Sequence, residues 1–145
     1  MSQENVEIVR AVLAANRDPA VVARAISGEL DLGWVDPEIE WDASRLGEMI
    51  PDLAQVYRGR DGVRTYWRRW FDAWRDLEFE VQDVLDAGDD VVALISNQRQ
   101  WGRHTGICTE LPPYAQVFTV RGGMLVRWRT FPDQASALRA VGLEG

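Results

Sequence analysis

Lysine is absent from this chain of 145 residues, so all 16 of its basic residues are arginines. A chain without lysine has no side-chain amine for a Schiff base, for attachment of pyridoxal phosphate or for a Walker A motif. Histidine and cysteine occur once each, as His104 and Cys108. One histidine and one cysteine cannot complete a closed zinc site, and a single cysteine cannot form an intrachain disulfide. We therefore expect neither a metal nor a cofactor.

Long hydrophobic runs and a surplus of positive charge are also missing. No stretch approaches the roughly 18 apolar residues of a membrane helix, and the first five residues have no signal-peptide character. The chain has 23 acidic and 16 basic residues and a net charge of -7. Nucleic acids and anionic membranes bind basic surfaces, so we expect neither as a partner. The single cysteine suits a reducing compartment, and we expect a cytoplasmic protein.

The composition is that of a soluble globular protein, with 46% hydrophobic and 27% charged residues. A chain of this length buries roughly 68–70% of its unfolded surface, which is enough for one hydrophobic core. No linker, repeat or low-complexity segment divides the sequence. We expect a single domain over residues 1–145.

Apolar residues at helical spacing predict three helices in the first half of the chain. The first runs from Ser2 to about Asn16, and the second lies between the capping residue Asp18 and a stop at Gly28. The third begins near Asp61. Its apolar face carries Val63, Trp67, Trp70 and Trp74, so this helix must bury a broad aromatic stripe.

Alternating apolar and polar residues predict the strands. Residues 34–42 form one strand interrupted near Pro37, and residues 46–54 have no period and predict a loop. Residues 79–131 contain four strands. A turn at 87–90 and a tight turn at Gly122-Gly123 connect neighbouring strands, and Pro112-Pro113 interrupts the third strand. A last helix follows the capping residue Asp133. Helices followed by a run of strands indicate an α+β fold.

The order of these elements resembles the nuclear transport factor 2-like superfamily, and its SnoaL-like branch most closely. The resemblance covers nearly the whole chain. It rests on the two N-terminal helices, Glu40-Trp41-Asp42, Tyr57-Arg58-Gly59-Arg60-Asp61-Gly62-Val63, and the hairpin from Gln116 to Trp128. It implies a cone-shaped, strongly curved antiparallel sheet wrapped around the N-terminal helices, with an apolar pocket at the wide end. Members are often homodimers, so the resemblance also implies a homodimer.

Four functional positions of this superfamily can be placed on the sequence. Asp42 matches the general-base aspartate that the isomerases carry after the first strand. Gln116 stands where these enzymes carry a protonated aspartate, and Thr130 where the SnoaL-like cyclases carry an acid/base aspartate. Arg10 falls near the position of the isomerases' tyrosine donor. Only Asp42 keeps the residue type of the family, so it is the candidate catalytic residue.

Asp42 and Gln116 each have a functional and a structural interpretation. If Asp42 lies in an apolar pocket beside Trp41, the pKa of its carboxyl is raised and it can act as a base. If Asp42 lies at a solvated strand end, that pKa keeps its ordinary value. Gln116 is in phase with Phe118, so both side chains are candidates for the pocket lining. The Gln116 amide can donate to a ligand oxygen or satisfy buried backbone groups.

The remaining ligand-binding candidates come from three other parts of the chain. Trp128 and Thr130 share a face of the last strand, and the resemblance places Thr130 inward. Trp41, Tyr57 and Trp67 are candidates for an aromatic wall, although aromatic residues at helical spacing more often form core. Arg99 is in phase with Val91, Ala93 and Ile95, so it either points into the cone or lies on a dimer surface. The glycines around His104 indicate an exposed turn.

These candidates predict a protein that binds a small, mostly apolar molecule in the cone, with acid/base chemistry at a carbonyl or hydroxyl as one option. The alternative is a non-catalytic ligand-binding or dimeric scaffold module whose pocket is filled by side chains, for which seven tryptophans suffice. Whether the protein is an enzyme therefore stays open. A pocket of at least ~300 Å³ that reaches Asp42 would favour a ligand, and a closed core would favour the scaffold.

Overall fold

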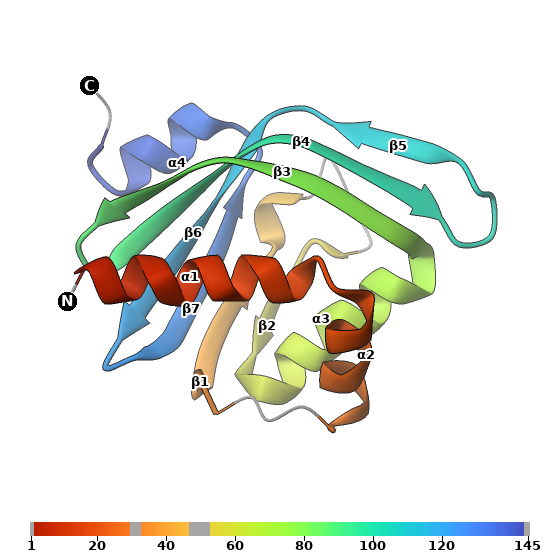
Figure 1. The fold of residues 1–145 in the computed structure, drawn as a ribbon, viewed down its shortest axis with the longest axis horizontal. Coiled ribbons are helices and arrows are strands. Elements are labelled where there is room, and N and C mark those ends of the chain that lie inside the picture. The colour runs from red at the N-terminus through yellow and green to blue at the C-terminus, as the bar shows by residue number, and fades with distance from the viewer. Residues whose placement is uncertain (1, 30–32, 47–52, 144–145) are drawn as a thin grey trace.

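The computed structural model describes residues 2–29, 33–46 and 53–143. Its helices and strands follow one another as shown in Figure 1. The elements are α1 (Ser2–Asn16), α2 (Pro19–Ser27), β1 (Val35–Asp42), the 3-10 helix η1 (Ser44–Leu46), β2 (Val56–Arg58), α3 (Gly59–Ala73), β3 (Trp74–Ala87), β4 (Asp90–Gly102), β5 (Cys108–Leu111), β6 (Tyr114–Arg121), β7 (Met124–Phe131) and α4 (Gln134–Ala140). Of the loop expected at 46–54, residues 47–52 lie outside the described part of the chain.

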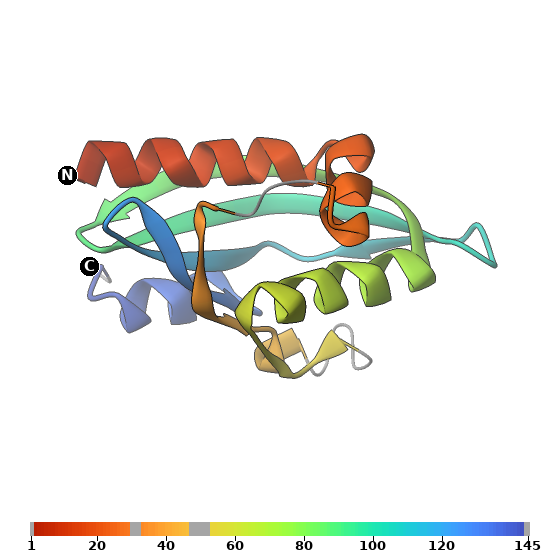
Figure 2. The same ribbon diagram turned by 90° about the horizontal axis from the view of Figure 1, so that it is seen from below.

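The strands form one curved sheet in the order β2-β1-β7-β6-β4-β3, and β5 pairs with the far end of β4. The pairs are antiparallel except for β1 and β7, which run parallel. Helix α1 lies across one face of this sheet and α4 against the opposite face (Figure 2). The expected α+β architecture with a cone-like sheet is confirmed.

The helix boundaries follow from local chemistry. In α2, the Asp18 carboxylate accepts a hydrogen bond from the backbone N–H of Ala20, and Gly28 ends the helix in the left-handed conformation, as predicted. Helix α3 begins at Gly59, slightly earlier than expected, and ends at Ala73. The backbone of Trp74 is extended, so this residue opens β3 and does not continue the helical stripe.

The sheet carries a hydrophobic core on each face. The larger core contains the buried side of α1, the buried side of α3 and the concave face of the sheet. The smaller core lies on the other face, where Ala137 of α4 packs against side chains of β4, β6 and β7. The buried residues of α3 are Val63, Tyr66, Trp67 and Trp70. Most of the aromatic side chains therefore fill the concave side.

A β-bulge in β4 changes which residues face the concave side. Glu80 pairs with Asn97 while the next residue, Val81, pairs with Ile95, so Ser96 is an extra residue. Ile95 belongs to the concave core, yet beyond the bulge it is Gln98 that is buried and Arg99 that is exposed. The prediction that Arg99 keeps the phase of Ile95 is therefore wrong, because one inserted residue reverses the alternation of a strand.

Candidate ligand-binding site

Stacked aromatic rings occupy the middle of the concave face. Trp41 and Trp128 are register partners in β1 and β7, and their rings stack with centroids 4.5 Å apart. The Tyr66 ring, from α3, lies 5.7 Å from both. Trp67 contacts Tyr66 edge-on at 5.2 Å. Tertiary structure thus joins three of the predicted aromatic residues, Trp41, Trp67 and Trp128, into one wall that fills much of the cone.

A chain of polar side chains lies beside this wall. Trp128 Nε1 donates to Gln116 Oε1 at 3.4 Å, and Gln116 Nε2 donates to the Tyr114 hydroxyl at 3.2 Å. The Tyr114 hydroxyl donates to Gln98 Oε1, and Gln98 Nε2 donates to Gln100 Oε1 at 3.0 Å. The sequence pattern predicted Gln116 and put Tyr114 in phase with it, but Gln98 and Gln100 were missed, because the bulge at Ser96 of β4 was not visible in the sequence pattern.

The polar chain encloses little space. The cavity that Gln116, Trp128 and Thr130 line has a volume of about 20 Å³, which is room for about one water molecule. Burial raises the pKa of the Tyr114 hydroxyl above its ordinary value, so this phenol stays protonated at neutral pH. The groups around the cavity are therefore neutral donors and acceptors. The cavity is far smaller than the pocket expected for an organic ligand in the cone.

Asp42 lies on the other side of the sheet. It follows Trp41 in β1, and its register partner in β7 is Arg129. Because adjacent strand residues point to opposite faces, Asp42 points away from the face that carries Trp41, Trp128 and Thr130. Its carboxylate accepts hydrogen bonds from the backbone N–H of Ser44 at 2.9 Å, the Ser44 hydroxyl and Arg45 Nη1 at 3.2 Å. Asp42 is 7% exposed and does not line the cavity of Gln116 and Thr130.

The surroundings of Asp42 lower the pKa of its carboxyl group, whereas a catalytic base would need a raised pKa. Burial by itself raises the pKa of this carboxyl, but the two hydrogen bonds from Ser44 and the charges of Arg45 and Arg127 outweigh it. The net result is a pKa below the ordinary value for aspartate. The expectation of a raised pKa is wrong, because Asp42 is buried among donors and cations and not in an apolar pocket.

The other predicted site residues lie apart from the polar chain. Tyr57 is buried, its hydroxyl donates to the Leu53 carbonyl at 3.1 Å, and it contacts Tyr66 edge-on. Phe118 is fully buried in the larger core. The Arg99 side chain is half exposed and forms an ion pair with Glu78 at 3.5 Å. The structure therefore brings Gln116, Trp128 and Thr130 together but leaves Asp42 and Arg99 elsewhere.

A larger pocket opens between the two N-terminal helices. It has a volume of about 310 Å³ and is lined by Ile8, Ala11, Val12, Ala15, Val21 and Trp34. We call it the helix-side pocket. The sequence pattern did not predict this pocket. Ala11 and Ala15 lie one helical turn apart beside the apolar stripe of α1, and the space exists because their side chains are small. The lining side chains are all apolar apart from the indole N–H of Trp34.

A smaller cavity continues the helix-side pocket toward the sheet. It has a volume of about 40 Å³ and shares Val12, Ala15, Val21 and Trp34 with the pocket outside it. We call it the inner cavity. Its other lining residues are Asn16, Val22, Ala25, Trp41, Val63 and Trp67. The two spaces together form an apolar site that reaches from the surface of α1 and α2 to the aromatic wall.

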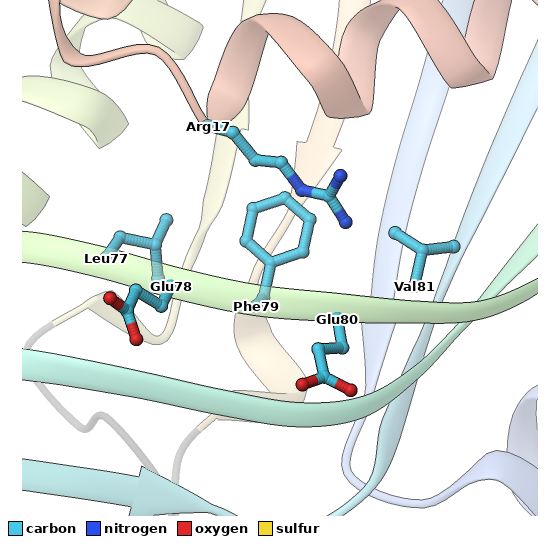
Figure 3. A pocket seen from close by; sticks show the side chains of 6 residues that line it. All are labelled: Arg17, Leu77, Glu78, Phe79, Glu80 and Val81. Atoms are coloured by element: carbon cyan, nitrogen blue, oxygen red, sulfur yellow. The ribbon is translucent and has the colours of Figure 1, made fainter.

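An open hollow of about 560 Å³ lies on the β3 side of α1. The guanidinium of Arg17 lies over the Phe79 ring, 4.6 Å from its centroid, while Glu78 and Glu80 point away from α1 (Figure 3). This hollow is shallow and lies on the surface along one strand. The helix-side pocket is more enclosed and apolar, and is therefore the better candidate for a small molecule.

Within the described residues, no group of three or more histidine, cysteine, aspartate or glutamate side chains is placed to hold a metal ion. No helix in that part of the chain is long and apolar enough to span a membrane.

Comparisons with solved structures identify the fold. An NTF2-like protein of unknown function from Burkholderia pseudomallei superposes with a TM-score of 0.70 at 19% identity, over 95% of this chain and 97% of that one. TerC, co-crystallised with polyporic acid, gives a TM-score of 0.68 at 19% identity, over 96% and 98%. An NTF2-like protein from Burkholderia thailandensis gives 0.66 at 26% identity, over 97% of each chain.

No curated protein matches the sequence. The family model of the SnoaL-like domain, in contrast, matches residues 32–128, well over half of the chain. This stretch runs from just before β1 to Trp128 of β7 and so contains the aromatic wall and the polar chain. The chain belongs to the SnoaL-like domain family.

Proposed function

We propose that this protein binds a small, mostly apolar molecule in the helix-side pocket. The observation that carries the proposal is the pocket of about 310 Å³ with its apolar lining, which continues into the inner cavity. Ligand sites in proteins are concave, mostly apolar and of ~300–1,000 Å³, so the helix-side pocket is at the lower end of that range. The ligand is therefore a small molecule of about one to three rings.

The chemistry of the lining favours binding without acid/base catalysis. The residues that line the helix-side pocket carry no titratable side chain. Asp42, the one predicted base, lies on the opposite face of the sheet with its carboxylate held by Ser44 and Arg45. An isomerase or a cyclase needs a base next to its substrate. A non-catalytic binding module needs only the pocket.

The expected affinity is moderate. A ligand and pocket that together bury ~400 Å² of apolar surface gain about 10 kcal/mol from the hydrophobic effect. Association costs at least ~4 kcal/mol in lost translation and rotation. The difference is at most about 6 kcal/mol and corresponds to dissociation constants between about 40 μM and 1 mM. TerC was co-crystallised with polyporic acid, which supports the proposal that this fold accommodates small organic molecules.

A titration with the neutral fluorescent probe N-phenyl-1-naphthylamine tests the proposal. Ala11 lines the helix-side pocket near its mouth, so Ala11→Phe fills the pocket without expanding the buried core. Ala14 is exposed on the same helix and is not part of the lining, so Ala14→Phe is the matched control. We expect saturable binding to the wild type and to Ala14→Phe, and at least about tenfold weaker binding to Ala11→Phe.

Equal binding by the two phenylalanine variants would place the probe elsewhere and overturn the proposal. No saturable binding by the wild type would favour the scaffold alternative, in which the aromatic wall only fills the cone. The homodimer stays a prediction, and sedimentation of the wild type would test it independently of the ligand.

A further inference from the structure

We infer that the ligand carries one neutral oxygen that accepts a hydrogen bond, and that the indole N–H of Trp41 donates to it in the inner cavity. The inference rests on the proposed function and adds the chemical class of the ligand. Its body is apolar and fills the helix-side pocket, and its oxygen belongs to a ketone, ester, ether or alcohol.

The first observation is a buried donor without an acceptor. Trp41 is 2% exposed, and its Nε1 has no hydrogen-bond partner among the described residues. The neighbouring Trp128 differs, since its Nε1 donates to Gln116 Oε1. An indole N–H can only donate, and a buried donor left unpaired is destabilising. Trp41 therefore supplies a hydrogen bond that the described part of the protein does not use.

The second observation is where Trp41 lies. It lines the inner cavity, which shares four lining residues with the helix-side pocket. With about 40 Å³, the inner cavity has room for a carbonyl or hydroxyl group but not for a second ring. A ligand whose rings fill the outer space therefore reaches Trp41 only with a small terminal group.

The lining also decides the charge of that group. The residues that line the inner cavity are apolar except for Asn16 and the three indole N–H groups of Trp34, Trp41 and Trp67, and none of them is charged. A carboxylate brought into such surroundings would lose its hydration without gaining a cation. A neutral acceptor loses far less hydration and gains the hydrogen bond from Trp41. We therefore expect the site to discriminate against acids.

Three ligands of nearly equal shape test the inference. Cyclohexyl methyl ketone carries the acceptor, isopropylcyclohexane replaces its oxygen by a methyl group, and cyclohexanecarboxylate replaces its methyl group by a charged oxygen. The nitrogen-proton NMR signals of the indoles are followed during each titration of the wild type. We expect the Trp41 signal to move downfield with the ketone only, and the carboxylate to bind most weakly.

Variants provide the second measurement. We expect Trp41→Phe to lower the ratio of ketone affinity to hydrocarbon affinity about five- to tenfold, because only the ketone loses a hydrogen bond. Trp101→Phe is the control, since Trp101 is half-buried near the end of β4 and lines neither space. The smaller phenylalanine side chain changes the packing around both ligands alike, so this change cancels in the ratio of the two affinities.

The outcomes separate the inference from the proposed function. If none of the ligands binds, the proposed function fails. If ketone and hydrocarbon bind alike and the Trp41 signal does not respond to the ketone, the inference is overturned while the proposed function stands. Should Trp41→Phe not fold, the wild-type spectra decide.

Discussion

Asp42 and Arg129 stand opposite each other in the parallel pair of β1 and β7, on the sheet face away from the stacked rings of Trp41 and Trp128. One step along each strand therefore separates an aromatic face from a face with buried charged side chains. The charged side contains Arg45 and Asp90 as well, which form ion pairs with Asp42 and Arg129 respectively. Asp42 thus has the surroundings of a structural carboxylate.

Replacing Asp42 with alanine should destabilise the protein and leave ligand binding in the helix-side pocket unchanged. The substitution removes the acceptor of three hydrogen bonds from Ser44 and Arg45, which we expect to cost about 1–3 kcal/mol at pH 7. Urea denaturation of the wild type and the variant measures the difference. A loss of probe binding in a folded Asp42→Ala protein would contradict this structural role.

The contribution of Asp42 to stability should depend on pH in the acidic range. Its pKa in the folded protein is lower than the ordinary value near 3.9, so the unfolded state binds the proton more readily. The contribution is therefore complete above the unfolded pKa and disappears as the pH falls through the folded pKa. The denaturation curves of wild type and Asp42→Ala should therefore converge as the pH falls below the pKa of Asp42 in the folded protein. If the difference in stability between wild type and Asp42→Ala grew on acidification, the pKa of Asp42 would be raised in the folded protein, and this prediction would be wrong.

Two buried threonines should respond differently to replacement by valine. The Thr119 hydroxyl donates to Asp90 Oδ1 at 2.5 Å, so Thr119→Val should cost about 1–2 kcal/mol. The Thr130 hydroxyl has no hydrogen-bond partner among the described residues, so Thr130→Val should change stability by less than about 0.5 kcal/mol or increase it. Thermal unfolding of both variants checks the difference, and a large loss in Thr130→Val would reveal a partner.

Gly59 should tolerate alanine less well than Gly28. Both residues have a positive φ, 73° and 87°, which costs an alanine about 1 kcal/mol. A Cβ at Gly28 would meet nothing within 4 Å, whereas at Gly59 it would lie 3.2 Å from the Pro37 carbonyl oxygen. We expect Gly59→Ala to destabilise the protein more than Gly28→Ala by chemical denaturation. Equal losses would show that backbone strain alone matters at both sites.

Removing the cap of α2 should weaken the helix-side pocket. Asp18 accepts a hydrogen bond from the backbone N–H of Ala20, and Val21 in the same first turn lines the pocket. Asp18→Ala should cost about 0.5–2 kcal/mol and reduce affinity for the fluorescent probe, whereas Asp18→Asn should retain most of both. Amide hydrogen exchange in α2 provides the direct measurement. Unchanged probe affinity in a frayed α2 would argue against its role as a pocket wall.

The helices were predictable because their signals are local. Asp18 and Gly28 frame α2 through contacts within a few residues, and Asp133 caps α4 in the same way. The strand β2 was missed, since three residues are too few for a period of two to appear. The parallel pairing of β1 with β7 joins residues almost ninety positions apart, which no local pattern specifies.

The candidate site was predicted only in part. Gln116, Trp128 and Thr130 could be placed together because β6 and β7 form a tight hairpin with regular alternation near these residues. Arg99 was misplaced because the extra residue Ser96 has no signature in the composition of β4. The helix-side pocket was missed because it depends on small side chains of α1 meeting Trp34, which lies beyond the next helix in the sequence.

The amino-acid sequence alone determined the α+β class, the caps of α2 and α4, the family resemblance and the exclusion of lysine chemistry, since these follow from residue types and short-range periodicity. Tertiary structure decided the position of the helix-side pocket, the lack of a partner for the Trp41 indole among the described residues, and the face on which Asp42 lies. Empty space and unmade hydrogen bonds depend on how distant segments pack, and a single inserted residue reverses the direction of a side chain.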